Sequence, residues 1–362
     1  MHAKRVYSLA GATVGVLASA SLAVHAIGQG LAYGRGLVTK HAVKQVDRLL
    51  SNAAVVVWDY FAYWVPYVIG ARKEIWVAMD WTDFDRDGHC VLALNMITRH
   101  GRATPLMWMT VDKATLKGQR NDHEDRLLAR FKAVLPPGVA VTLLADRGFA
   151  DQKLFEFLTE ELGFGFIIRT RGNVNVTSDG DETRPAAQWV GQGGRAKILR
   201  NARVTASGYA VAALVCVHAK DMKEPWCLVA NRSDMKASEI IKGYGKRWSI
   251  EPAFRDSKDP HFGMGMKQLR IGSADRRDRL LLVSALATAL LTLLGAAGES
   301  LGYDRLLKSN TVKHRVHSLF RQGQMLYELI PTMPAARLGP LMHRFAEMLN
   351  EHRVFTGIFG TT

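Results

Sequence analysis

The segment of residues 121–162 constrains the fold more than any other stretch of the chain. A helix is expected from about Asn121 to Val134, an apolar strand from Val139 to Ala145, and a second helix from about Asp151 to Leu162. A strand between two helices is typical of an α/β fold. The strand ends in Asp146, at the sheet edge where α/β proteins form ligand sites. The alternative is that Asp146 only caps the helix that follows.

Three further strands are expected upstream of this unit. The runs Glu74–Thr82, Val91–Ile97 and Leu106–Val111 are mostly apolar and have the length of strands. The residues 83–89 between the first two runs contain Asp and Gly, which are typical of a hairpin turn. This turn mimics the start of a calcium-binding loop, but the twelfth position is Leu94 instead of a glutamate, so we do not expect calcium.

Asp80 lies near the end of the first of these strands. A carboxylate on a buried strand must be paired with a cation or must ligate a metal ion, because its burial alone is costly. The alternative is a carboxylate that caps an exposed strand end. Asp80 and Asp146 are therefore two candidate metal ligands.

A polar stretch later in the chain carries a third candidate acid, Glu251. Four of its side chains would lie within about 60° of one another on a single helix: Tyr244, Arg247, Glu251 and Lys258. Glutamate is a hard oxygen ligand for Mg²⁺, and Arg and Lys neutralise phosphate oxygens. Pro252 either kinks this helix or lies in the first turn of a new one. The alternative is a solvated amphipathic helix whose charges provide solubility.

The spacing Y-x2-R-x3-E-x6-K of these four residues resembles the signature of the insertion-sequence-four family of bacterial DDE transposases. The segment Asp259-Pro-His-Phe-Gly-Met-Gly265 is similar to the family's downstream segment. The string Ala145-Asp-Arg-Gly-Phe149 is similar to the segment around the family's second aspartate. The resemblance covers roughly residues 40 to 290.

This resemblance implies an α/β fold with an RNase H-like catalytic core, a β-rich insertion, an N-terminal helical DNA-binding region and a helical C-terminal tail. The stretch after residue 171 is rich in Gly, Asn and Thr and contains alternating, strand-like segments. The expected parts are a DNA-binding region over 1–70, a core over 71–170 and 231–300, an insertion over 171–230 and a C-terminal region over 301–362.

The resemblance also implies a reaction and a cofactor. Asp80, Asp146 and Glu251 would form a D-D-E triad that holds two Mg²⁺ (or Mn²⁺) ions. The reaction would cut transposon ends and join them to target DNA by phosphoryl transfer. Its partners would be double-stranded DNA and a second copy of the chain, as a homodimer on paired ends. A metal-dependent nuclease, or an inactive relative that only binds DNA, would share the same residues.

Six residues are expected to contact DNA: Tyr244, Arg247, Lys258, Trp226, Arg147 and Arg270. Trp226 begins a predicted strand at the place where the family has a tryptophan that stacks on a flipped base. The alternative is a tryptophan packed within the sheet. Arg147 would hold a phosphate or a neighbouring carboxylate, and Arg270 lies in the basic segment Gln268–Arg279, which suits backbone phosphate.

The charge and the cysteine content fit a nucleic-acid partner. The chain has 48 Lys and Arg against 33 Asp and Glu, a net charge of +15. Such an excess favours a polyanion, nucleic acid before an anionic membrane. The 3 cysteines form no C-x2-C pair, so we expect reduced thiols and no structural zinc. We therefore expect a cytoplasmic, nucleoid-associated protein without a membrane partner.

Two apolar stretches favour a different class, a secreted or membrane-tethered basic protein. The run Tyr7–Gly28 follows a basic start and has the features of a signal peptide. We expect instead two short helices separated near Gly28–Gly36, the second of them basic and amphipathic over Lys40–Asn52. The run Leu280–Gly298 is about long enough to span a bilayer. We expect it to be a buried helix behind the sheet.

Overall fold

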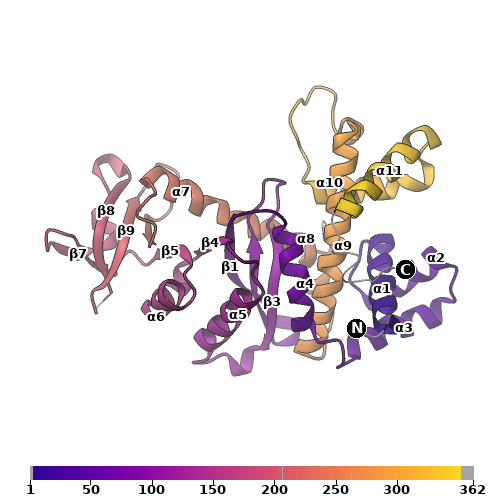
Figure 1. Cartoon of the computed structure of the whole chain (residues 1–362), viewed down its shortest axis with the longest axis horizontal. Coiled ribbons are helices and arrows are strands. Elements are labelled where there is room, and N and C mark those ends of the chain that lie inside the picture. Colours follow the sequence, from indigo (N-terminus) through magenta and orange to yellow (C-terminus); the bar gives the residue numbers. More distant parts are fainter. Residues whose placement is uncertain (1–2, 206, 262, 352–362) are drawn as a thin grey trace.

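One large mixed sheet runs through the middle of the computed structural model, which describes residues 3–205, 207–261 and 263–351. Its ten strands follow the order β3-β2-β1-β4-β5-β10-β9-β8-β6-β7 (Figure 1). The strands are β1 Glu74–Phe84, β2 His89–Met96, β3 Thr104–Asp112, β4 Ala140–Ala145, β5 Gly165–Thr170, β6 Asn175–Thr177, β7 Thr183–Pro185, β8 Lys197–Val204, β9 Tyr209–Val217 and β10 Trp226–Ala230.

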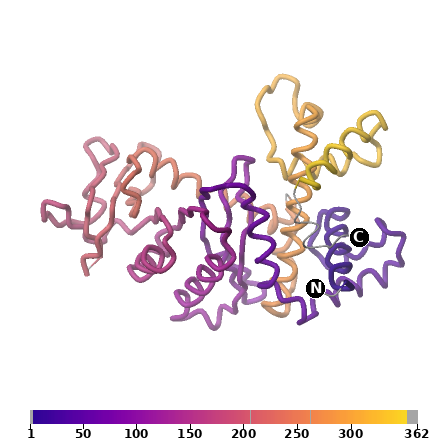
Figure 2. The backbone as a smooth tube through the Cα atoms, in the orientation of Figure 1, coloured from indigo at the N-terminus to yellow at the C-terminus, as the bar shows by residue number. Residues whose placement is uncertain are grey.

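Helices precede, interrupt and follow the strands along the chain. They are α1 Ala3–Ser19, α2 Val24–Arg35, α3 Thr39–Ser51, α4 Val57–Ile69, α5 Arg120–Val134, α6 Gln152–Glu156, α7 Ala237–Gly245, α8 Ile250–Lys258, α9 Ala274–Ser300, α10 Leu319–Leu329 and α11 Ala335–Glu351. Figure 2 shows the chain passing from the N-terminal helices through the central strands to the outer strands, and back through α7 and α8 to α9.

The first five strands form a mixed core. β1, β2 and β3 pair antiparallel, and the turn between β1 and β2 closes at Gly88, whose φ of 64° suits glycine. β4 pairs parallel with both β1 and β5. This α/β arrangement is compatible with the RNase H-like core that was expected. The predicted runs at 74–82, 91–97, 106–111 and 139–145 all lie on these strands, to within a residue or two at their ends.

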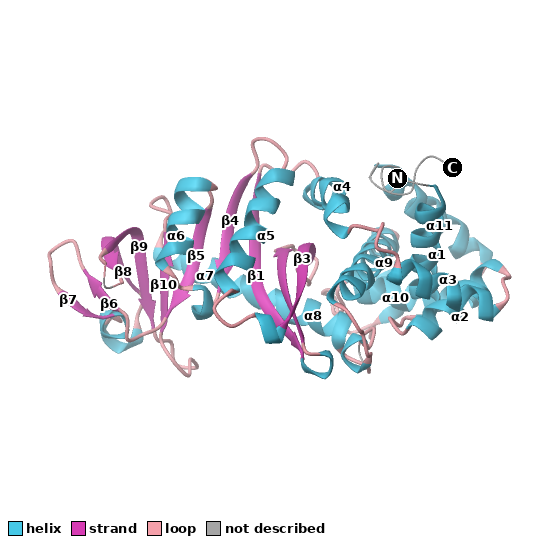
Figure 3. Ribbon diagram, turned by 90° about the horizontal axis from the view of Figure 1, so that it is seen from below, coloured by secondary structure: helices cyan, strands magenta, loops and turns pink. Residues whose placement is uncertain are grey.

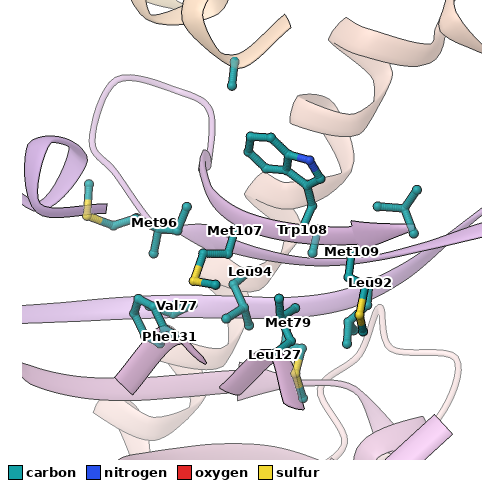
Figure 4. Close-up of a cluster of buried hydrophobic side chains, with 14 of the residues drawn as sticks. Val77, Met79, Leu92, Leu94, Met96, Met107, Trp108, Met109, Leu127 and Phe131 are labelled. Carbon is teal, nitrogen blue, oxygen red and sulfur yellow. The ribbon is translucent and has the colours of Figure 1, made fainter. Parts of the chain in front are cut away.

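Helix α5 covers one face of this core. Alternate residues of a strand share a face, so Val77 and Met79 of β1 point the same way. Both are fully buried, as are Leu127 and Phe131 of α5, which pack near them in Figure 4. Burying one such side chain stabilises the fold by about 1.5–3 kcal/mol. The opposite face, with Ala78 and Asp80, is left for the elements that follow β10.

Beyond β5 the sheet continues through β10, β9, β8, β6 and β7, with antiparallel pairing at each step (Figure 3). These five strands all lie within residues 171–230, the stretch in which strand-like segments were expected. The helix expected over 151–162 is divided into α6 and a wider π-helical turn over Phe157–Glu161.

Residues 3–51 form three helices where two were expected. The unexpected break follows Ser19, where Ala20 has a φ of 48°. The break expected near Gly28–Gly36 lies at Gly36, and the basic helix expected over Lys40–Asn52 is confirmed as α3. Gly28 lies inside α2 instead of between helices. A Cβ atom at Gly28 would come within 2.5 Å of a Val43 methyl group on α3. Gly28 therefore allows α2 and α3 to pack closely. In the sequence alone, a glycine with this role looks the same as a glycine that ends a helix.

Helix α9 has 27 residues and contains the run at 280–298, which was expected to be helical. By length and composition it is apolar enough to cross a membrane. The rest of the chain buries 61% of its most apolar window. Helices α1 and α2 pass the same test only as a pair that bends by 96°. Helix α9 packs against β3, α1, α10 and α11, so it lies beside the edge strand of the sheet (Figure 1).

The charged start of α9 binds protein groups, which corrects the expectation that the whole segment to Arg279 binds phosphate. Arg276 pairs with Asp47 on α3, at 2.6 Å. Arg277 is fully buried and pairs with Asp87. Arg279 donates to the carbonyl of Leu50 at 3.0 Å. These arginines hold the N-terminal helices and the β1–β2 turn against α9. The sequence shows that this segment is basic, but it does not show which groups the arginines bind.

Candidate active site

The register between β1 and β4 places Asp80 beside Asp146. The parallel pairing joins Ala78 to Leu144, and each aspartate lies two residues further along its own strand direction. Two residues are one pleat repeat, so both carboxylates project from the same face of neighbouring strands, which are about 4.8 Å apart. Asp146 also accepts a hydrogen bond from the Gly148 amide at 2.8 Å.

The segment from Tyr244 to Lys258 lies on that same face, but it is not one straight helix. Helix α7 ends at Gly245, a 3-10 turn η7 covers Lys246–Ser249, and α8 begins at Ile250. Pro252 lies in the first turn of α8, where its missing N–H leaves no helix hydrogen bond unmade. Of the two positions expected for this proline, the structure shows the start of a new helix.

Helix α8 is held on the sheet by an apolar contact and an ion pair. Ile250 is fully buried in a cluster with Ala78 and Ala103. Arg102, in the β2–β3 loop, donates to Asp256 at 2.5 Å. Because both ends of α8 are fixed in this way, Glu251 is presented in its first turn as an exposed carboxylate on the Asp80 face.

Arg247 joins this segment to the first acid. Its Nη1 lies 3.3 Å from Oδ2 of Asp80, and only 8% of the Arg247 side chain is exposed. The pKa of Asp80 is raised to about 6, mainly because the carboxyl is buried. The positive charge of Arg247 opposes this rise, and the negative charges of Asp146 and Glu251 contribute to it. Asp80 is therefore near enough to each of the other two acids to be affected by its charge.

The three carboxylates are of the chemical type that a hard divalent cation prefers, since such ions bind carboxylate oxygens. They are not gathered into a finished site: across residues 3–205, 207–261 and 263–351, no three His, Cys, Asp or Glu side chains are grouped closely enough to hold a metal ion. What the structure shows is that Asp80 lies near both other acids and against Arg247.

The other signature residues lie around the acids. Lys258 donates from Nζ to the Thr82 hydroxyl and to the Asp83 carbonyl, both at 2.9 Å, and burial lowers its pKa. Tyr244 is only 2% exposed. Its ring packs edge-to-face with Trp226, with the ring centres 5.0 Å apart. Trp226 is the first residue of β10, and here its ring packs on Tyr244.

Arg147 and Arg270 occupy different settings. Arg147 donates to Glu224 at 2.8 Å, and Arg169 of β5 donates to the same oxygen at 2.9 Å. Of the two partners expected for Arg147, the structure shows the neighbouring carboxylate. Arg270 is exposed just before α9. It differs in this from Arg276 and Arg279, which bind groups of the N-terminal helices.

Sequence reasoning missed several residues at this face. The indole of Trp248 is 47% exposed, and the Arg247 guanidinium carbon lies 5.4 Å from its ring centre. The position of Trp248 directly after Arg247 in the signature segment could have identified it as a candidate. A groove of about 580 Å³, here named the Lys258 groove, has a basic lining that only the fold assembles: Arg86, Arg255, Lys258 and Lys267, with Asp259, Pro260 and Gln268.

Asp80→Asn is expected to stabilise the metal-free protein above about pH 6. The folded-state pKa of Asp80 lies above the ordinary value, so the native state binds more protons between about pH 4 and 6. Stability therefore falls as pH rises through this window, and the asparagine variant avoids that loss. The gain at pH 7.5 should be about 1–2 kcal/mol, below the full value of the shift because part of the side chain meets solvent.

Urea unfolding in chelator at about pH 5 and about pH 7.5 measures this difference. Asp122→Asn, at an exposed position on α5, is the matched control and should change stability equally little at both pH values. A gain for Asp80→Asn that does not grow with pH would show that the pKa of Asp80 is not raised.

Comparison with known protein families identifies the part of the chain that contains this segment. A family model described as the transposase DDE domain matches residues 100–289, which is more than half of the chain. The match includes Asp146, Glu251 and the whole segment from Tyr244 to Lys258. No curated protein matches the chain. The chain belongs to the DDE transposase family.

Proposed function

We propose that this chain is a DNA transposase of the insertion-sequence-four group, with Asp80, Asp146 and Glu251 as its catalytic acids. It would cut transposon ends and join them to target DNA. One observation carries the proposal: the β1–β4 register aligns two acids on one face, and the signature segment presents Glu251 and Arg247 to that face. A solvated amphipathic helix would not have Arg247 buried against Asp80.

The three carboxylates would hold two divalent ions, Mg²⁺ or Mn²⁺. Such ions, if bound, would supply activation of a water or of a DNA 3′-hydroxyl and stabilisation of the leaving 3′-oxygen. The chain's own cations would position the strand. The Nε atom of Arg247 is buried without a hydrogen-bond partner among the described groups, so it retains a donor for a phosphate oxygen. Lys258 would neutralise a second phosphate from its place beside Thr82.

The proposal assigns DNA binding to residues 1–70, the catalytic core to 71–170 and 231–300, a β-rich insertion to 171–230 and a helical C-terminal region to 301–362, of which 352–362 lie outside the described residues. A groove of about 610 Å³ between α1 and α3 supports the first assignment. Its basic lining comprises Lys4, Arg5, His41, Lys44 and Arg48. Such a lining attracts phosphate.

The remaining DNA contacts are proposed at Tyr244, Trp226, Arg147 and Arg270. Exposed Arg270 needs no rearrangement to meet a backbone phosphate. Trp226 and Tyr244 cover each other, and Arg147 is paired with Glu224, so these three would exchange partners when DNA binds. A homodimer on paired ends and a cytoplasmic, nucleoid-associated location without a membrane partner complete the proposal. The net charge of +15 supports the DNA partner.

Removal of divalent metal is expected to stop cutting and leave binding in place. The test uses a labelled duplex that carries the transposon end flanking this gene, with Mg²⁺ or with chelator. Cutting followed by joining to a second duplex supports the transposase. Cutting without joining supports a metal-dependent nuclease that has the same triad. Binding without cutting by the folded protein supports an inactive relative, and cutting in chelator rejects the metal-dependent mechanism.

A further inference from the structure

A second basic groove lies at the opposite end of β1 from the Lys258 groove. It has a volume of about 880 Å³ and is here named the Lys246 groove. Its cations come from four separate segments: Arg72 after α4, Arg99 in the β2–β3 loop, Lys246 in η7 and Arg315 before α10. The lining has one carboxylate, Glu74, which pairs with Arg232 at 3.4 Å. The excess of positive charge therefore fits an anionic ligand.

The four cations differ in whether their side chains already bind protein groups. Arg72 donates to the carbonyls of Val68 and Ile69, at 3.2 and 2.7 Å, and so terminates α4. Arg315 forms an ion pair with Glu299. Arg99 and Lys246 are exposed, and the Lys246 ammonium lies 5.3 Å from the centre of the Trp76 ring. The last two are the main candidates for ligand contact.

Strand β1 shows how the two grooves lie relative to the acids. Trp76, Ala78, Asp80 and Thr82 are alternate residues, so they follow one another on one face. Trp76 lines the Lys246 groove, and Thr82 accepts from Lys258 at the other groove. Asp80 lies between them, about 13 Å from Trp76 at about 3.3 Å per residue. The acids are therefore flanked by a basic groove on each side.

This spacing suits a DNA strand that crosses the acids. Successive phosphates of one strand of duplex DNA are about 3.4 Å apart along the axis, so about 13 Å corresponds to about four nucleotides. Arg and Lys contacts to phosphate carry no sequence information, and they fix the position of the strand on the protein. A cut at one phosphate needs the backbone held on both sides of it.

We propose that the Lys246 groove binds the sugar-phosphate backbone on one side of the scissile phosphate, and that the Lys258 groove binds it on the other. This inference rests on the proposed function. It adds a second backbone site, in which Arg99 and Lys246 would contact the phosphates and Arg72 and Arg315 complete the basic lining. The bound backbone is either that of the transposon end or that of the flanking DNA, which the duplexes below distinguish.

The test measures DNA binding by fluorescence anisotropy in chelator, so that it does not depend on cutting. The variant is the double substitution Arg99→Gln/Lys246→Gln. The control is Lys117→Gln/Lys153→Gln, which removes the same charge at two exposed positions on other elements. Three duplexes are compared: one with the end and its flank, one with the end but no flank, and one with the flank and an end cut back to about two base pairs from the cleavage site, short of the roughly four nucleotides that separate the acids from the Lys246 groove.

Removal of two phosphate contacts should weaken binding of the full duplex roughly 10- to 30-fold at about 0.15 M salt, and should reduce the slope of log K against log salt by about two. The control should change binding by less than about twofold. One shortened duplex lacks the DNA segment that the Lys246 groove binds, and the variant should bind this duplex as well as wild type does. The identity of that duplex shows whether the groove binds the transposon end or the flanking DNA.

Equal weakening on all three duplexes, or no weakening on any, would overturn the proposal. The proposed function is judged separately. If wild type cuts the end duplex with Mg²⁺ while the double variant binds like the control, the second backbone site is wrong and the transposase stands. If wild type neither binds nor cuts the end duplex, both are wrong.

Discussion

Glu251→Gln is expected to lower the rate of strand cleavage at a transposon end by at least about 10³-fold, which corresponds to about 4 kcal/mol of transition-state stabilisation. The substitution keeps the size of the side chain and removes the charge that would ligate the metal. Glu251 is exposed in the first turn of α8, so its loss should leave the fold and DNA binding close to those of wild type. Single-turnover cleavage with Mg²⁺, together with end binding in chelator, measures both properties.

The matched control is Glu328→Gln, an exposed glutamate on α10. It removes the same charge away from the acids and should cut at the wild-type rate. Equal cutting by wild type and Glu251→Gln would remove Glu251 from the catalytic acids. Loss of cutting in both variants would point to a general effect of charge, and the assignment would lose its support.

Gly323→Ala is expected to destabilise the fold by more than about 3 kcal/mol, the largest effect on stability that we predict. Helices α9 and α10 cross with their backbones in contact. A Cβ atom at Gly323 would lie 1.8 Å from the carbonyl oxygen of Leu291, and one at Gly295 would lie 1.9 Å from that of Leu319. Main-chain oxygens cannot rotate away as side chains do, so the helices would have to separate. Denaturant unfolding, or the yield of folded protein, measures the loss.

Gly34→Ala is the control for this substitution. Gly34 also lies in a helix, α2, and a Cβ atom there would make an ordinary contact of 3.5 Å with a Val14 methyl group. Alanine in a helix is favoured over glycine by about 0.5–1 kcal/mol, so this variant should be as stable as wild type or slightly more stable. A Gly323→Ala protein with wild-type stability would show that α9 and α10 do not cross at these glycines.

Local pattern was enough to predict much of the core. The strands at 74–82, 91–97 and 139–145 could be identified from short apolar runs bounded by turn residues, because strand and turn formation depends on neighbours within a few positions. Asp80 and Asp146 were found because each is a carboxylate near the end of such a run. Their alignment in one register and the burial of Arg247 against Asp80 came from the structure.

The expectations that the structure corrects share one cause. The same residue type can serve different structural roles, and the sequence does not show which role applies. Gly28 resembles a helix break and instead permits contact with Val43 on another helix. Arg277 resembles a phosphate ligand and instead pairs with Asp87. In both cases the deciding partner is remote in sequence, and no local window contains it.

Inspection of the sequence was enough to identify the α/β character of the core, the candidate acids, the signature spacing and the strong positive charge. Periodicity, spacing and composition are properties of the chain that survive any arrangement of its elements. The folded chain was needed to show which arginines at the start of α9 pair with protein groups, how the signature divides between α7 and α8, and that Arg99 and Lys246 line one groove. These depend on side chains far apart in sequence meeting across the sheet, and only packing of the whole chain brings them together.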